Sequence, residues 1–193
     1  MEQKYCVPWL KKAAPFDFIM SFFKWFYCLD IPVVIALAVA VTLVFLILKE
    51  RFRESRFWTP AACCLMAVWL IVVVYITVVR RESSAEQDSA WIPLYSYRLA
   101  FSGVNWELLR SNLMNVMLFY PAGLLAGSVL PNGKKRLAWI LLAAFCALSL
   151  CIELSQYFFH LGLAETDDVL HNTLGAFLGV MAAKWPMRQE WEN

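Results

Sequence analysis

The chain has 193 residues, of which 61% are hydrophobic and only 17% are charged, whereas roughly half of a soluble domain is apolar. Its net charge of +2, from 17 Lys and Arg against 15 Asp and Glu, is too small and too scattered for a nucleic-acid-binding face. This composition excludes a water-soluble globule and predicts an all-α, polytopic bundle of transmembrane helices.

Residues 1–30 form an N-terminal arm ahead of the first long apolar run. Within it, residues 16–30 mix aromatic side chains with Asp17, Lys24 and Asp30, which favours a helix in the headgroup layer over one that crosses the bilayer. The arm lacks the basic, apolar and small-residue order of a cleaved signal, so we expect the first apolar segment to stay in the protein. A crossing by residues 16–30 is the alternative.

Residues 31–193 are predicted to form one transmembrane domain, because apolar runs of about the length that crosses a bilayer recur along them. The spans are expected near residues 31–48, 58–79, 112–130, 137–158 and 168–184. Short basic loops follow the first and third spans, and such loops are typically cytoplasmic. The pattern predicts a multi-pass membrane protein with its N-terminus outside and its C-terminus in the cytoplasm. A crossing by residues 16–30 would instead place the N-terminus inside.

Acidic and amide side chains recur at one end of the last three spans, where each is costly in lipid. Residues three or four apart share a helix face, as do Glu153 and Gln156, and Asp168 and Asn172. We therefore expect an outward-facing polar and acidic pocket. Its predicted members are Asn115, Glu153, Gln156, Glu165, Asp168 and Asn172, with Asn112 nearby.

The alternative for these polar residues is a structural role in hydrogen bonds between helices. For Asn112, Asn115 and Gln156 the two interpretations weigh equally. Function is favoured for Glu153 and Asp168, because a carboxylate at membrane depth is costly when it only joins helices. Asp167 and Glu165 also fit solvated caps at the start of the last span.

Small residues predict how the last three spans pack. Gly123 and Gly127, and likewise Gly175 and Gly179, are four residues apart and form small-xxx-small seams that allow close helix approach. Pro121 lies between Phe119 and the first seam, removes a backbone hydrogen bond and is expected to kink the helix.

No cofactor or metal is expected. The six cysteines show no metal-ligand spacing beside histidines, and the chain contains no HExxH motif. His160 and His171 are interpreted as hydrogen-bonding partners.

Three segments taken together resemble the VanZ-like family of small integral membrane proteins. They are NVMLFYPAG at 115–123, IELSQ at 152–156 and GLAETDDVLHNTLGAFLG at 162–179. RRE at 80–82 and IPLYSYRLAF at 92–101 resemble a loop found in one branch of the family, and the whole resemblance covers roughly residues 58–184. The family pattern corresponds here to Asn115, Phe119, Pro121, Gly123, Glu153, Gln156, Glu165, Asp168, Asn172 and Gly175.

One departure concerns the charge of this pattern. Many members have an arginine just after the glycine that matches Gly162, whereas this chain has Leu163. We expect that the acids are less neutralised here, or that Arg81, Arg98 or Arg110 of the long loop takes the place of that arginine.

The resemblance implies a contribution to glycopeptide resistance of the teicoplanin type, or to cell-envelope homeostasis, in a family whose biochemical activity is not established. Our first hypothesis is that the pocket binds a lipid headgroup, a cell-wall precursor or an amphiphile. Membrane lipids are the expected partners, with a cell-wall precursor, a glycopeptide or lipopeptide, or a second copy of the chain as further partners. The alternatives are a membrane-embedded enzyme that uses a carboxylate acid/base pair on a lipid-linked substrate, a small proton-coupled carrier, and a structural scaffold.

Overall fold

The computed structural model describes residues 30–52, 54–81, 83, 89–90, 92–94, 96–98, 106–131 and 133–184. The interfacial helix expected at residues 16–30 lies outside this part of the chain, apart from Asp30.

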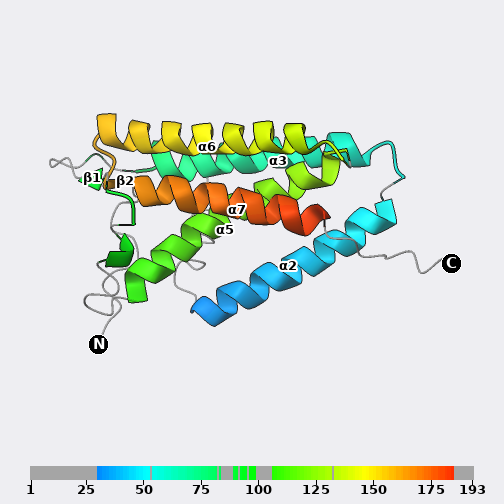
Figure 1. Ribbon diagram of the computed structural model, residues 1–193, viewed down its shortest axis with the longest axis horizontal. Coiled ribbons are helices and arrows are strands. Elements are labelled where there is room, and N and C mark those ends of the chain that lie inside the picture. Colours follow the sequence, from blue (N-terminus) through cyan, green and yellow to red (C-terminus); the bar gives the residue numbers. More distant parts are fainter. Residues whose placement is uncertain are drawn as a thin grey trace.

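Long helices build nearly all of the described fold, which confirms the all-α, polytopic architecture (Figure 1). The helices are α2 (Ile31–Phe52), α3 (Trp58–Val74), α5 (Trp106–Val129), α6 (Lys135–Phe158) and α7 (Thr166–Lys184). A π-helical turn, η1 (Tyr75–Val79), continues α3. Two short parallel strands, β1 (Ser89–Ala90) and β2 (Ala164–Glu165), pair Ser89 with Ala164 and Ala90 with Glu165. This pairing holds part of the long loop beside the start of α7.

Four helices of the described chain are long and apolar enough to cross a membrane. They are α2, α3 together with η1, α5 and α6. The fifth predicted span coincides with α7, which is not among them, because its first turns carry Asp167, Asp168, His171 and Asn172. A crossing of the bilayer by α7 therefore stays a prediction.

The two glycine seams meet in the contact between α5 and α7. A Cβ added at Gly175 would lie 2.0 Å from Val116 O, and one added at Gly123 would lie 2.2 Å from Ala176 O. Backbone therefore touches backbone, as small-xxx-small motifs allow. The two helices run parallel because α6, between them in sequence, returns the chain to the starting end (Figure 1).

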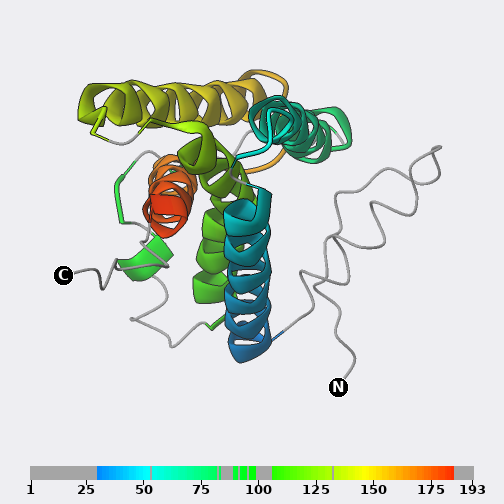
Figure 2. The same cartoon turned by 90° about the vertical axis from the view of Figure 1, so that its right-hand side faces the viewer.

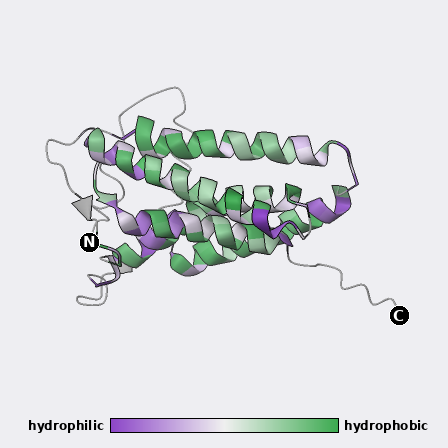
Figure 3. Ribbon diagram, turned by 45° about the horizontal axis from the view of Figure 1, so that its top comes forward, coloured by the Kyte–Doolittle hydropathy of each residue, from purple (hydrophilic) through white to green (hydrophobic). Residues whose placement is uncertain are grey.

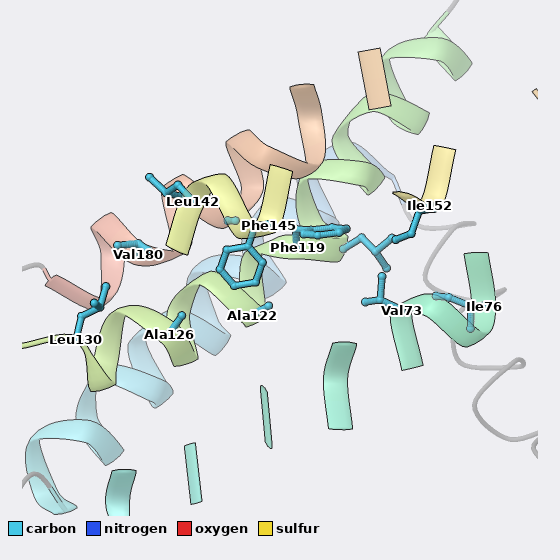
Figure 4. Packing of buried hydrophobic residues seen from close by; sticks show 12 residues of the cluster. Val73, Ile76, Phe119, Ala122, Ala126, Leu130, Leu142, Phe145, Ile152 and Val180 are labelled. Atoms are coloured by element: carbon cyan, nitrogen blue, oxygen red, sulfur yellow. The ribbon is translucent and has the colours of Figure 1, made fainter. Parts of the chain in front are cut away.

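The apolar core lies where α3, α5, α6 and α7 meet (Figure 4). At its centre Phe119 of α5 is fully buried and packs edge-to-face against Phe145 of α6, with ring centroids 6.3 Å apart. Pro121 lies inside α5, which continues to Val129. In the turn before this proline, Leu118 O accepts a 2.9 Å hydrogen bond from Trp69 Nε1 of α3. The proline-bearing helix is thus tied to its neighbour.

The first helix, α2, lies beside α5 (Figure 2). One polar contact joins them, between Thr42 Oγ1 and Tyr120 OH at 2.6 Å. Much of the outer surface of α2 is apolar, with Val44 57% and Ile47 58% exposed. Apolar side chains that face outward along a whole helix are suited to contact with lipid.

The bundle has two chemically different ends. Hydrophilic residues gather at both ends and hydrophobic residues dominate the helices between them (Figure 3). One end holds Lys49 and Lys184, whose ammonium groups donate to Ala183 O of α7 and to Leu130 O just after α5, respectively. The acidic residues at the start of α7 lie at the other end. The lysines Lys49 and Lys184 and the acidic residues thus lie at opposite ends of the bundle, while the orientation in the membrane stays a prediction.

Candidate functional site

A tight chain reversal between α6 and α7 positions the candidate site. Leu161 N donates to Gln156 O at 2.8 Å, and His160 and Gly162 have positive φ angles of 53° and 110°. Because α6 ends at Phe158 and β2 follows only a few residues later, the backbone of Glu165 comes back beside the last turns of α6.

Carboxylates from α6, β2 and α7 meet at this reversal. Glu153 is 2% exposed, and its Oε2 accepts a 3.0 Å hydrogen bond from Glu165 N. The charges of Glu153 and Asp168 interact, and Asp168 Oδ1 accepts from Asn115 Nδ2 at 2.5 Å. The structure therefore brings together Asn115, Glu153, Glu165 and Asp168, which we call the acidic cluster.

Arg81 is the cation whose charge acts on all three carboxylates of the acidic cluster. It follows η1, and its Nη1 donates to Leu161 O at 3.3 Å. The same nitrogen would lie 3.3 Å from a Cβ at Gly162, so the guanidinium lies over the chain reversal. Of the three arginines considered from the sequence, Arg81 is the one whose charge acts on these carboxylates, while Leu163 is exposed.

Two buried amides flank the acidic cluster. Gln156 Nε2 donates to Thr77 O in η1 at 3.3 Å, and Asn172 Nδ2 donates to Ser149 Oγ at 2.8 Å. Their oxygens, Gln156 Oε1 and Asn172 Oδ1, are buried without a hydrogen-bond partner among the described residues. Unsatisfied buried acceptors are uncommon, and π-helical turns are frequent at functional sites.

Asp167 belongs to a different network, which the sequence did not reveal. It is 2% exposed, and its carboxylate accepts hydrogen bonds from Leu94 N at 2.5 Å, Ser96 N at 3.0 Å and Ser96 Oγ at 2.6 Å. Asn112 Nδ2 donates to the same Ser96 hydroxyl at 3.0 Å. The interpretation of Asp167 as a solvated helix cap is wrong, because a segment of the long loop covers the start of α7 and supplies the donors.

His171 extends this network. Its Nε2 lies 2.8 Å from Tyr97 OH, which matches the hydrogen-bonding role predicted for it. Within the part of the chain that the structure describes, no group of three His, Cys, Asp or Glu side chains is placed to hold a metal ion.

Glu165 is the titratable group of the acidic cluster that lies outside the helices. Burial raises the pKa of Glu165 to about 7, and the negative charges of Asp168 and Asp167 act in the same direction, whereas Arg81 opposes them. Glu165 therefore changes its charge near neutral pH.

This shift predicts that part of the stability of the fold is lost as the pH rises. Glu165 releases its proton near pH 4.5 in the unfolded chain but near pH 7 in the folded chain. Between these two pH values the folded state therefore binds more protons than the unfolded state. Its contribution to the free energy of unfolding then falls from about pH 4.5 to about pH 7 and levels off above that. We expect Glu165→Gln to reduce this fall in melting temperature, measured in detergent from pH 5 to 8. An unchanged slope would contradict the assignment, and Glu50→Gln, an exposed carboxylate in α2, is the control.

Comparison with known proteins places these residues in a family. Residues 62–187 match the VanZ/LLP1 family, a segment that covers more than half of the chain and contains α5, α6, α7 and the acidic cluster. The chain belongs to the VanZ/LLP1 family. It is thus a VanZ-like, multi-pass membrane protein.

One curated relative is Protein VanZ of Enterococcus faecium, which is 38% identical over 72 residues, covering 37% of this chain and 42% of that protein. The aligned stretch therefore spans less than half the length of this relative. No solved structure matches the chain.

Proposed function

We propose that this VanZ-like protein acts at the outer face of the bacterial cytoplasmic membrane, where its acidic cluster binds the polar group of a lipid, a cell-wall precursor or another amphiphile. Through this binding it contributes to glycopeptide resistance of the teicoplanin type, or to cell-envelope homeostasis. The observation that carries the proposal is Glu153, which is 2% exposed and interacts with the charges of Asp168 and Glu165. Carboxylates in such surroundings are costly and typically serve function.

The arrangement of charge supports an outward-facing site. The basic loops and Lys49 lie at the end opposite to the acidic cluster, where Lys49 contacts Ala183 at the end of α7. Because short loops rich in Lys and Arg stay in the cytoplasm, the acidic cluster would face outward, with the N-terminus outside and the C-terminus inside.

The test uses a strain in which expression of the protein changes teicoplanin susceptibility. The variant Glu153→Gln, Asp168→Asn keeps the shape of each side chain and one acceptor oxygen in each, but removes two charges and replaces the other oxygen of each carboxylate with an NH2 group. At matched abundance in the membrane, we expect it to lose most of the change in minimum inhibitory concentration. Glu50→Gln removes an exposed carboxylate from α2 and should behave as the wild type. Equal susceptibility of the double variant and the wild type would refute the proposal.

The closeness of Glu153 and Asp168 favours a second candidate, an enzyme acting on a lipid-linked substrate. Neighbouring carboxylates are the arrangement that general acid/base catalysis uses. A lipid profile of the same strains separates the two candidates: a modified lipid that disappears in the double variant supports catalysis, whereas unchanged lipids together with changed susceptibility support binding alone.

A further inference from the structure

The acidic cluster has an excess of negative charge. Glu153, Glu165 and Asp168 share the charge of one guanidinium, that of Arg81, among the described residues. When all are ionised, two negative charges are left in surroundings where Glu153 is 2% exposed. Such charges require protons or a cationic partner.

The two buried amides that flank the cluster add hydrogen-bond acceptors without partners. Gln156 Oε1 has no partner among the described residues, and the orientation of this amide is fixed because Thr77 O, which faces Nε2, is only an acceptor. Asn172 Oδ1 is a second buried acceptor without a partner in the described chain. Gln156 and Asn172 are 2% and 3% exposed respectively.

The helix register places Asn172 one turn away from the carboxylates on the same two helices. Ser149 precedes Glu153 by one turn of α6, and Asn172 follows Asp168 by one turn of α7. Because α6 and α7 run in opposite directions, the Asn172–Ser149 hydrogen bond lies one turn deeper than the Glu153–Asp168 pair. An acceptor without a partner in the described chain thus lies about one turn from the carboxylates along both helices.

The turn beside the cluster is apolar and exposed. Phe158, Phe159 and Leu163 are 68%, 64% and 42% exposed, and they lie in the connection between the helices that carry Glu153 and Asp168. Apolar side chains beside a charged site suit a ligand that joins a polar group to an acyl chain.

We propose that the acidic cluster binds a primary ammonium group, R–NH3⁺, carried by the headgroup of a membrane amphiphile. A primary ammonium supplies one positive charge and three N–H donors. The carboxylates and the buried amide oxygens can accept hydrogen bonds from these donors. A quaternary ammonium carries the same charge without any N–H donor, and an anionic headgroup carries the wrong charge. The inference rests on the proposed function, because it specifies the ligand of the same site.

The experiment measures thermal unfolding of the purified full chain in detergent, with lipids of matched acyl chains added in turn. We expect phosphatidylethanolamine to bind at least about tenfold more tightly than phosphatidylcholine, because only the former donates N–H hydrogen bonds to charged acceptors. Phosphatidylglycerol is expected to bind no more tightly than phosphatidylcholine. Free ethanolamine tests whether the acyl chains of the ligand matter. If it stabilises the protein as much as the lipid does, the primary ammonium group is supported as the ligand, but the proposal of a membrane amphiphile is overturned.

Variants of the acidic cluster test whether the preference for phosphatidylethanolamine depends on these residues. Glu153→Gln, Asp168→Asn should abolish the preference for phosphatidylethanolamine while retaining a cooperative unfolding transition, and Glu50→Gln should keep the preference. Should the double variant fail to fold, Glu165→Gln at a half-buried position should still weaken the preference severalfold. A preference that persists in a folded variant, or equal binding of the two zwitterionic lipids, overturns the inference.

The two proposals fail separately. Susceptibility that depends on Glu153 and Asp168, without any preference for a primary ammonium, refutes only the ligand. Susceptibility that is the same in the wild type and the double variant refutes the proposed function itself.

Discussion

Replacement of Gly175 with alanine is expected to destabilise the folded bundle by about 3 kcal/mol or more, because overpacking against rigid backbone is among the most costly single changes. The added Cβ would lie 2.0 Å from Val116 O and 2.9 Å from Val116 C. No side-chain rotation relieves this overlap, so α5 and α7 must move apart. Chemical or thermal unfolding of the purified protein in detergent measures the loss.

The control for this prediction adds carbon atoms where nothing opposes them. Ala40 lies on the exposed surface of α2, and Ala40→Val should change stability by no more than about 0.5 kcal/mol. The same destabilisation is expected at Gly123, whose added Cβ would lie 2.2 Å from Ala176 O. If Gly175→Ala unfolded at the same temperature as Ala40→Val, the close contact between α5 and α7 would be disproved.

Separation of α5 and α7 would also disturb the site. Asn115 of α5 donates to Asp168 of α7, and this hydrogen bond lies at the end of the helix pair that the glycine seams hold together. A glycine variant that still folds is therefore expected to lose the proposed ligand binding along with stability.

Local sequence patterns were sufficient to predict the helices. The expected spans 31–48 and 137–158 correspond to Ile31–Phe52 and Lys135–Phe158, because the length of an apolar run is a property of the run itself. The glycine seams were predictable for the same reason, since their spacing places two small residues on one helix face. The start of α5 at Trp106 was missed, because its first turn carries Glu107 and extends beyond the apolar run.

Contacts between distant residues could not be predicted in this way. Asp167 and Ser96 are 71 residues apart, and nothing in the spacing of either segment indicates that the long loop folds over the start of α7. The bond between Gln156 and Thr77 depends likewise on how α6 packs against η1. The sequence identified which polar residues are costly in a membrane, whereas their partners depend on the tertiary fold.

The choice among Arg81, Arg98 and Arg110 illustrates the same limit. All three lie in the polar stretch between the second and third spans, and their chemistry is identical. The position of Arg81 two residues after η1, where it reaches Leu161 O, distinguishes it.

Arg81→Gln is expected to lower the stability of the fold by about 2 kcal/mol, because removal of one partner from a partly buried set of charges leaves the others unbalanced. The carboxylates of Glu153, Glu165 and Asp168 would lose the cation that acts on all of them. Thermal unfolding at pH 8 should show the largest deficit, since Glu165 is then ionised. At pH 5 the deficit should shrink, because protons replace the missing positive charge.

The test of this explanation is to restore the positive charge lost with Arg81 by placing an arginine at residue 163. Residue 163 follows Gly162, next to which Arg81 Nη1 lies, and many VanZ-like sequences carry arginine there. The double variant Arg81→Gln, Leu163→Arg should therefore recover at least about half of the lost stability, whereas Arg81→Gln, Leu163→Gln should not. Arg98→Gln, at an exposed position of the loop, is the control and should match the wild type. Failure of arginine at position 163 to restore stability would mean that Arg81 acts through its bond to Leu161 O rather than through its charge on the carboxylates.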